Sequence, residues 1–136
     1  MRIGRMVRPI TILAAVVAIG MATVIGATTA DAAVYRCTVS GTAGLICANV
    51  TAIDPGSVLR QHQQPNYTSA VDLNTHYTNG NRLLLLCWTT GSGDIDGHGD
   101  HYWFKVDDGI IAWGYVNDWY VNTGSYAQWS PYVRHC

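Results

Sequence analysis

The side chains best suited to recognition in this sequence are aromatic. Five Trp, eight Tyr and one Phe lie between residues 35 and 132. A core built from so short a chain cannot enclose all of these rings, so some of them must lie at the surface. Aromatic rings offer a large contact area at a small cost in conformational entropy, and they dominate small recognition sites. The composition therefore indicates a surface that binds a ligand.

The stretch DIDGHGD, at residues 94–100, carries three carboxylates within seven residues. An EF-hand calcium loop places a third ligand before its Gly and ends in a bidentate Glu, and both are missing here. Zinc bound by His98, Asp100 and His101 is less favoured still, because catalytic zinc needs three ligands on rigid elements. We expect a solvated loop, with weak calcium binding as the alternative, and we expect no metal site and no cofactor.

Residues used in catalysis are present, but they form no pattern. A ribonuclease-like site would need two His and a cation in one cleft. Lys105 could be the cation, and the candidate histidines are His62, His76, His98 and His101. No spacing links them, and the G-x-S-x-G motif of serine hydrolases is absent. We therefore expect a protein that is not an enzyme.

The N-terminal 32 residues read as a secretory signal peptide. Arg2, Arg5 and Arg8 form a positive segment, residues 10–27 are apolar, and Ala30-Asp31-Ala32 supplies an A-x-A cleavage site. The alternative is a membrane anchor that is retained, since the apolar run is long for a signal peptide. Cleavage after residue 32 would leave 104 residues, which is enough for one domain with one core.

The exported part is mildly acidic. After residue 32 it contains five Lys or Arg residues and eight Asp, which gives a net charge of −3. Nucleic acids and anionic membranes are recognised by clustered Lys and Arg. We therefore expect no nucleic-acid partner and, after signal cleavage, no membrane partner.

The elements that would carry the aromatic residues are β-strands. Residues 101–121 contain two apolar runs separated by Asp107-Asp108-Gly109, a tight-turn signal that predicts a hairpin. A short helical turn is expected near residues 117–119. The run RLLLLCW at residues 82–88 is too short for a helix and predicts a buried central strand. Residues 35–39 and 45–50 predict a second hairpin around a flexible turn.

Four cysteines lie in the exported part: Cys37, Cys47, Cys87 and Cys136. An even number in an oxidising compartment implies two disulfides, for which three connectivities are possible. Cys37 and Cys47 face each other across the predicted N-terminal hairpin. Cys87–Cys136 would then pin a tail with few strand signals to the central strand. We predict these two pairs.

Several segments resemble a bacterial SH3-like (SH3b) domain of the small secreted actinobacterial type. The C-terminal half carries the order Trp103-x-Lys105-Val106, a turn, Gly114-Tyr115-Val116, a bend and Tyr120-Val121, and the central strand ends in CWTTG at residues 87–91. The resemblance implies an all-β fold: an SH3-like barrel over residues 58–123. A hairpin extension at 33–57 would precede the barrel and a disulfide-pinned tail at 124–136 would follow it.

The resemblance also implies a place for the binding surface. In SH3b domains that bind peptidoglycan, the groove lies between a long early loop and the last hairpin. Carried over to this sequence, the groove residues are Tyr67, Trp103, Tyr115, Trp119 and Tyr120. Trp103 and Tyr120 could instead be core residues, because small barrels seal their ends with aromatic rings. Trp119 follows the bend at Asn117-Asp118 and is the ring most expected at the surface.

These observations predict a secreted, non-catalytic binding module that is extracellular or associated with the cell wall. Its partner would be peptidoglycan, a cell-wall peptide or another extracellular ligand. The alternative is a small disulfide-stapled effector or inhibitor that binds a secreted protein. The fold is compatible with both functions. In either case we expect a monomer.

Overall fold

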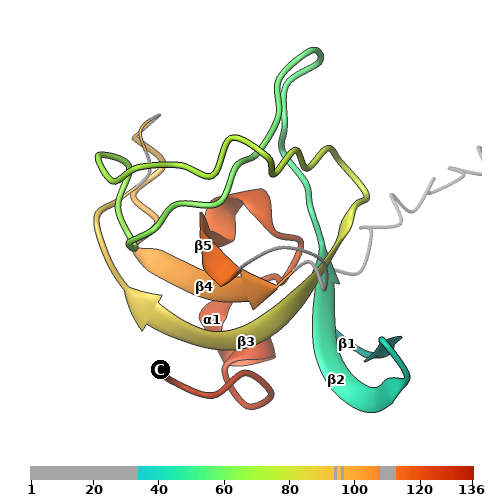
Figure 1. The fold of residues 1–136 in the computed structure, drawn as a ribbon. Helices are drawn as coiled ribbons and strands as arrows, with labels where there is room; N and C mark the ends of the chain where they lie inside the picture. Colours follow the sequence, from blue (N-terminus) through green and yellow to red (C-terminus); the bar gives the residue numbers. More distant parts are fainter. Residues whose placement is uncertain (1–33, 94, 96, 108–112) are drawn as a thin grey trace, which may run out of the picture.

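A computed structural model describes residues 34–93, 95, 97–107 and 113–136 (Figure 1). The signal peptide predicted at 1–32 and the hairpin turn at 108–109 lie outside these residues. The described chain is mostly β-structure with little helix, as the sequence predicts. None of the helices in this part of the chain has the length and hydropathy of a membrane span.

Five antiparallel strands form one sheet in the order in which they occur along the chain. They are β1 (Tyr35–Val39), β2 (Thr42–Asn49), β3 (Arg82–Thr90), β4 (Tyr102–Asp107) and β5 (Trp113–Asn117). A 3-10 helix, η1 (Asp118–Tyr120), follows β5 directly, and one short helix, α1 (Tyr126–Trp129), lies in the tail. The sequence therefore located the central strand, the last hairpin and the helical turn correctly.

The central strand β3 has one buried face and one partly covered face. Leu83 and Leu85 lie on the buried face, and a bulge between Leu85 and Cys87 then switches the faces, so that Trp88, paired with Phe104, continues the core face and Cys87, paired with Lys105, lies on the other. On each side of the bulge the side chains alternate with the period of two expected for a strand. The buried face packs against residues of β4 and β5 and of the tail, chiefly Phe104, Val106, Val116 and Trp129. Each large apolar side chain buried in this way contributes roughly 1.5–3 kcal/mol to folding.

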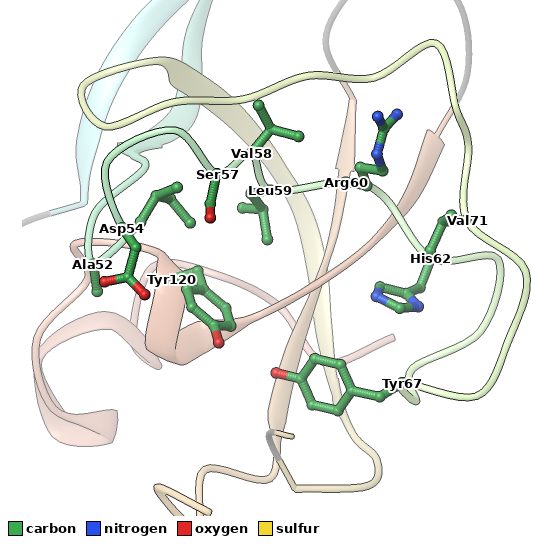
Figure 2. Close-up of a pocket in the computed structure, with 11 residues that line it drawn as sticks. Ala52, Asp54, Ser57, Val58, Leu59, Arg60, His62, Tyr67, Val71 and Tyr120 are labelled. Atoms are coloured by element: carbon green, nitrogen blue, oxygen red, sulfur yellow. The ribbon is translucent and has the colours of Figure 1, made fainter. Parts of the chain in front are cut away.

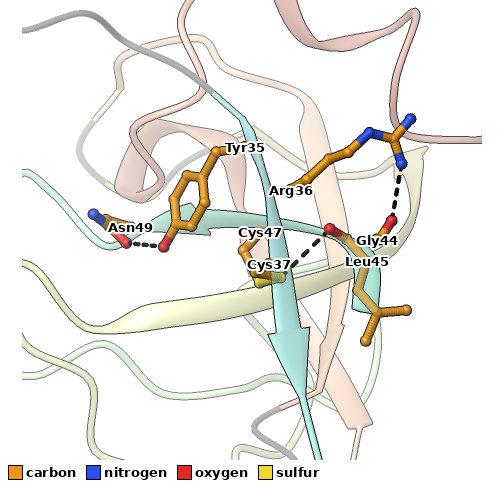
Figure 3. The surroundings of a disulfide bond; sticks show 7 residues. All are labelled: Tyr35, Arg36, Cys37, Gly44, Leu45, Cys47 and Asn49. Atoms are coloured by element: carbon orange, nitrogen blue, oxygen red, sulfur yellow. Dashed lines mark hydrogen bonds between the residues drawn. A yellow bond between two sulfur atoms is a disulfide. The ribbon is translucent and has the colours of Figure 1, made fainter. Parts of the chain in front are cut away.

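The first two strands form the hairpin that the sequence predicts (Figure 3). Ser40 and Gly41, at the turn between them, have φ values of 49° and 82°, the positive pair that a type I′ turn requires. The disulfide Cys37–Cys47 joins the two strands. The hairpin is continuous with the main sheet, because β2 pairs with β3 through contacts such as Cys47 with Leu84.

The C-terminal tail is fixed to β3 by a disulfide and by backbone bonds. Cys87–Cys136 is formed, so both predicted pairs are confirmed. The backbone N–H of Trp88 donates to the carbonyl of Arg134 at 2.9 Å, and that of Cys136 donates to the carbonyl of Trp88 at 2.8 Å. The tail thus pairs with the edge of β3, where His135 forms a parallel bridge with Trp88.

The segment between β2 and β3 contains no strand longer than an isolated bridge in residues 51–81, all of which the structure describes. Bridges pair Leu59 with Tyr77, and His62 with both Val71 and Tyr115 of β5. Figure 1 shows this green to yellow-green segment running across one end of the sheet. The segment is irregular in conformation but attached at several points.

Candidate functional site

The long irregular segment and the helix η1 enclose a cavity of about 430 Å³, which we call the tyrosine cavity (Figure 2). Its walls are Ala52, Ile53, Asp54, Ser57, Val58, Leu59, Arg60, His62, Tyr67, Val71 and Tyr120. Two of the predicted groove residues, Tyr67 and Tyr120, are among them. Figure 2 shows both phenol rings directed into the same space.

Tyr67 is positioned by the contact between its loop and the end of β3. The carbonyl of Pro65 accepts a bond from the N–H of Ser92 at 3.1 Å, and the N–H of Tyr67 donates to the Ser92 hydroxyl at 3.4 Å. A Cβ at Gly91 would lie 1.9 Å from the Pro65 carbonyl oxygen. Only a residue without a side chain allows the loop to cross the strand this closely.

Tyr67 belongs to a group of three aromatic rings. The Tyr67 and Trp103 ring centroids are 4.8 Å apart, and the His62 ring meets both rings edge-on. Trp103 is 0% exposed, and its indole N–H donates to the carbonyl of Ser92 at 2.7 Å. Burial lowers the pKa of His62, partly offset by a bond with the Ser69 backbone. Trp103 therefore supports the cavity wall from within the core.

Tyr120 is positioned by the cap of η1. The Asn117 side chain accepts a bond from the N–H of Trp119 at 3.0 Å, and Val121 N–H donates to the carbonyl of Asp118 at 2.8 Å. The Tyr120 carbonyl accepts from Thr51 N–H at 3.0 Å. The half-buried Tyr120 ring also packs against the core. The two phenols are thus held by elements far apart in the sequence.

The cavity also contains polar groups that the sequence did not single out as site residues. Arg60 donates to the carbonyls of Leu73 and Thr75 at 2.7 and 3.3 Å, so its guanidinium also orders the loop. Asp54 begins a turn that the Ser57 N–H closes by donating to the Asp54 carbonyl at 3.0 Å. The sequence signalled a turn at Asp54-Pro55-Gly56. It did not show that this turn lies near Tyr120, because that depends on the folded path of the chain.

The other predicted groove residues lie elsewhere. The backbone of Tyr115 exchanges two hydrogen bonds with that of His62, at 2.7 and 2.8 Å, and so anchors the loop to β5. Trp119 is 41% exposed and stacks on His98 with the ring centroids 3.7 Å apart. It lines a separate groove on the other side of η1. Of the five predicted residues, Tyr67 and Tyr120 line the tyrosine cavity, Trp103 and Tyr115 support it, and Trp119 lies at a second surface.

The loop considered for calcium is only partly described, since Asp94 and Asp96 lie outside the described residues. Asp100 accepts a bond from Tyr102 N–H at 2.9 Å. Within the described part of the chain, no three His, Cys or carboxylate side chains are grouped closely enough to bind a metal. Weak calcium binding by this loop stays the untested alternative to a solvated loop.

Comparison with known proteins does not identify a relative. No protein-family model, curated protein or solved structure matches this chain. The similarity to SH3b domains therefore stays a prediction drawn from the residues quoted above, and the geometry of the cavity becomes the main basis for inferring function.

Proposed function

We propose that this protein is an exported, non-catalytic binding module whose ligand enters the tyrosine cavity. The observation that supports this most directly is the meeting of Tyr67 and Tyr120 in one cavity of about 430 Å³. The resemblance to SH3b domains implies a groove between the long loop and the last hairpin; Tyr67 belongs to that loop and Tyr120 follows the hairpin, which supports the proposal. In this proposal residues 58–123 form the SH3-like barrel, with the β1–β2 hairpin and the tail added to it.

The chemistry of the cavity suits a short peptide or a peptide-bearing cell-wall fragment. Phenol rings contribute contact area and adaptable hydrogen bonding with few rotatable bonds to fix. Val58, Leu59 and Val71 supply apolar surface, and Asp54 and Ser57 supply polar groups. Ligand sites combine apolar walls with placed polar groups, and the lining of this cavity contains both kinds of surface.

The guanidinium that lines the cavity is already engaged in structure, and the imidazole is a weaker base than usual. The Arg60 guanidinium is bonded to two loop carbonyls, and burial among Tyr67 and Trp103 lowers the pKa of His62. A general base needs a pKa near the working pH and reach to the proton that it abstracts. This arrangement favours binding over catalysis.

Two disulfides are typical of proteins exported to an oxidising compartment, which agrees with the predicted signal peptide. We therefore place the ligand outside the cell, with peptidoglycan first. A protein target is the second candidate, because Leu73 and Trp113 are exposed and line a smaller cavity of about 290 Å³. A protein partner would contact this second patch.

The test is co-sedimentation of the purified, disulfide-bonded protein with peptidoglycan. We expect the wild type to sediment and Tyr67→Ala to bind about tenfold more weakly, the loss typical of a central aromatic contact. Tyr67→Phe combined with Tyr120→Phe removes only the two hydroxyls and controls for loss of packing on Trp103. Tyr132→Ala, at an exposed ring outside the cavity, is the matched control that should bind normally.

Failure of the wild type to sediment would rule out peptidoglycan as the ligand. Normal sedimentation of both the Tyr67→Ala and the double Phe variants would show that the tyrosine cavity is not the site. Loss of binding in Trp113→Ala alone would move the site to the Leu73 and Trp113 patch.

A further inference from the structure

A second groove, of about 530 Å³, lies on the other side of η1 from the tyrosine cavity. We call it the tryptophan groove. Asp118 and Trp119 come from η1, His98 to Tyr102 from the segment that enters β4, and Tyr126 from the first residue of α1. Tyr120, the next residue of η1, faces the tyrosine cavity instead. The two sites are therefore separate.

Two exposed aromatic rings line this groove, and each is held by a second ring. Trp119 stacks on His98 with an interplanar angle of 11°. Tyr126 is 44% exposed and stacks on Tyr102 with the centroids 5.0 Å apart. Stacking fixes the orientation of the exposed rings before any ligand arrives. The face of an aromatic ring carries negative potential and attracts cations.

Two carboxyl groups lie in the same groove. Asp118 is 6% exposed, and its carboxylate accepts bonds from the Thr123 hydroxyl and, at 3.1 Å, from the Trp129 indole N–H. Burial raises the pKa of Asp118 to about 7; the bond from Thr123 opposes this rise, the charge of Asp100 adds to it, and the bond from Trp129 opposes it. The two carboxylates therefore repel each other.

Among the residues that the structure describes, the lining of the groove includes no Lys or Arg. The contrast with Trp113 is informative, because the Lys105 ammonium lies over the Trp113 ring, 3.5 Å from its centroid. The chain thus supplies a cation to one exposed indole. The groove around Trp119 combines an exposed indole with two acidic groups and receives no such cation from its lining.

We propose that the tryptophan groove binds an organic ammonium group, held against Trp119 and Tyr126 and facing the carboxyls of Asp100 and Asp118. An anion would be repelled by the two Asp residues, and a neutral ligand would leave their mutual repulsion in place. A small inorganic cation prefers a shell of oxygen ligands, whereas aromatic walls with acidic groups suit an alkylammonium ion. This proposal is independent of the ligand of the tyrosine cavity.

The charges that face the groove predict how binding depends on pH. Asp118 of η1 and Asp100 before β4 attract the cation when ionised, and His98 and His101 of the same segment repel it when protonated. Lowering the pH removes negative charge and adds positive charge, so both effects weaken binding. Binding in turn favours ionised Asp118 and lowers its pKa, as linkage requires.

The test uses choline as the probe and 3,3-dimethylbutan-1-ol, which replaces the charged nitrogen with carbon, as its neutral isostere. NMR of the full disulfide-bonded protein would follow the five indole N–H signals during titration. We expect choline to shift the Trp119 signal and to bind at least fivefold more tightly than the isostere. The affinity should fall with added salt and between pH 8 and pH 5.

Two variants test the residues. Asp100→Asn keeps an acceptor for the Tyr102 N–H but removes the charge, and we expect choline to bind about five- to tenfold more weakly. Trp119→Leu should weaken binding at least as much, and Trp113→Ala is the matched control that should bind normally. Equal affinity for choline and the isostere, or shifts centred on Trp113 or Trp103, would overturn the proposal. So would the absence of any shift, or normal choline binding by Asp100→Asn.

Discussion

The tyrosine cavity and the tryptophan groove share η1 as a wall but differ in chemistry. The cavity combines phenols and an apolar wall with the engaged guanidinium of Arg60, whereas the groove combines exposed indole and phenol rings with two carboxyls. Successive residues of a 3-10 helix point about a third of a turn apart. Trp119 and Tyr120 can therefore serve different sites although they are neighbours in the sequence.

The two sites also differ in what holds their walls. The cavity depends on backbone contacts of the long segment, at Gly91 with Pro65 and at His62 with Tyr115. The groove depends on side chains from the tail, which the Cys87–Cys136 disulfide and the bonds to Asp118 keep in place. Substitutions that disturb close backbone contacts should therefore affect ligand binding in the tyrosine cavity. Changes in charge or reduction of the Cys87–Cys136 disulfide should affect binding in the tryptophan groove.

The largest expected effect is that of removing the Cys87–Cys136 disulfide. Its cysteines are 49 residues apart, and the chain-entropy relation gives roughly 4 kcal/mol for a loop of that length. The free energy of unfolding of the Cys87→Ala, Cys136→Ala double variant should be lower by that amount. The variant should therefore unfold at a lower denaturant concentration. It should also lose choline binding, because Tyr126 and Trp129 lie in the released tail.

The matched comparison is the Cys37→Ala, Cys47→Ala double variant. That pair is 10 residues apart, so the same relation gives roughly 3 kcal/mol. The hairpin it joins lines neither the cavity nor the groove. We expect both sites to keep their ligands when this variant is folded. Loss of choline binding here as well would show that the groove is sensitive to global stability and not to the tail.

Next in size is the pH dependence of stability set by Asp118. Its pKa of about 7 in the folded protein exceeds the value of about 3.9 usual for an unfolded chain, so the folded state binds the proton more tightly. Stability contributed by protonated Asp118 is therefore complete below pH 4 and is lost as the pH rises through 7. The difference between the folded and unfolded pKa values corresponds to a change of roughly 2–4 kcal/mol in the free energy of unfolding between pH 4 and pH 7.

Urea unfolding of the wild type and of Asp118→Asn between pH 4 and pH 8 would measure this effect. The stability of the wild type should fall as the pH rises toward 7, and that of Asp118→Asn should not. His62 in the tyrosine cavity acts in the opposite direction, because burial lowers its pKa and its stabilising effect is lost as the pH falls below about 6.5. A curve for Asp118→Asn that still falls toward pH 7 would contradict the assignment to Asp118.

Gly91→Ala should have an intermediate effect that is confined to the tyrosine cavity. The new methyl group would meet the Pro65 carbonyl, so the loop must move, at a cost of roughly 1–3 kcal/mol. Thr90→Ala places the same residue one position earlier without a new contact and is the control. We expect Gly91→Ala to shift the Trp103 indole signal and to weaken ligand binding at Tyr67. Choline binding in the tryptophan groove should be unchanged.

The parts of the fold that the sequence predicted are those set by local signals. The short apolar run at residues 82–88 predicted β3, the turn residues between 39 and 45 predicted the β1–β2 hairpin, and the even cysteine set with that hairpin predicted both disulfides. The short helix α1 was missed, although Ser125 and Gln128 form a capping box that signals a helix start. Local sequence patterns were sufficient to predict strands, turns and disulfides that residues close in the sequence determine.

The division of the predicted groove residues could not be read from the sequence. The side of η1 on which the Trp119 and Tyr120 rings lie depends on the Asn117 cap and on the path of the tail. The approach of Arg60 and Asp54 to Tyr120 depends on contacts between distant segments, such as the bond from Thr51 N–H to the Tyr120 carbonyl and the bonds between Leu59 and Tyr77. Long-range packing fixes both, and no local pattern encodes it.

The smallest expected effect on stability is that of Trp119→Ala, which separates the two sites most cleanly. Trp119 is 41% exposed and contacts the side chain of His98 in a loop, so its removal should change the free energy of unfolding by less than about 0.5 kcal/mol. Tyr67→Ala should cost more, because the Tyr67 ring covers the buried Trp103. Thermal unfolding of the two variants would show the difference. If Trp119→Ala lowered the melting temperature as much as Tyr67→Ala, the Trp119 ring would be a structural support, and the groove would no longer be a site whose exposed ring is available to a ligand.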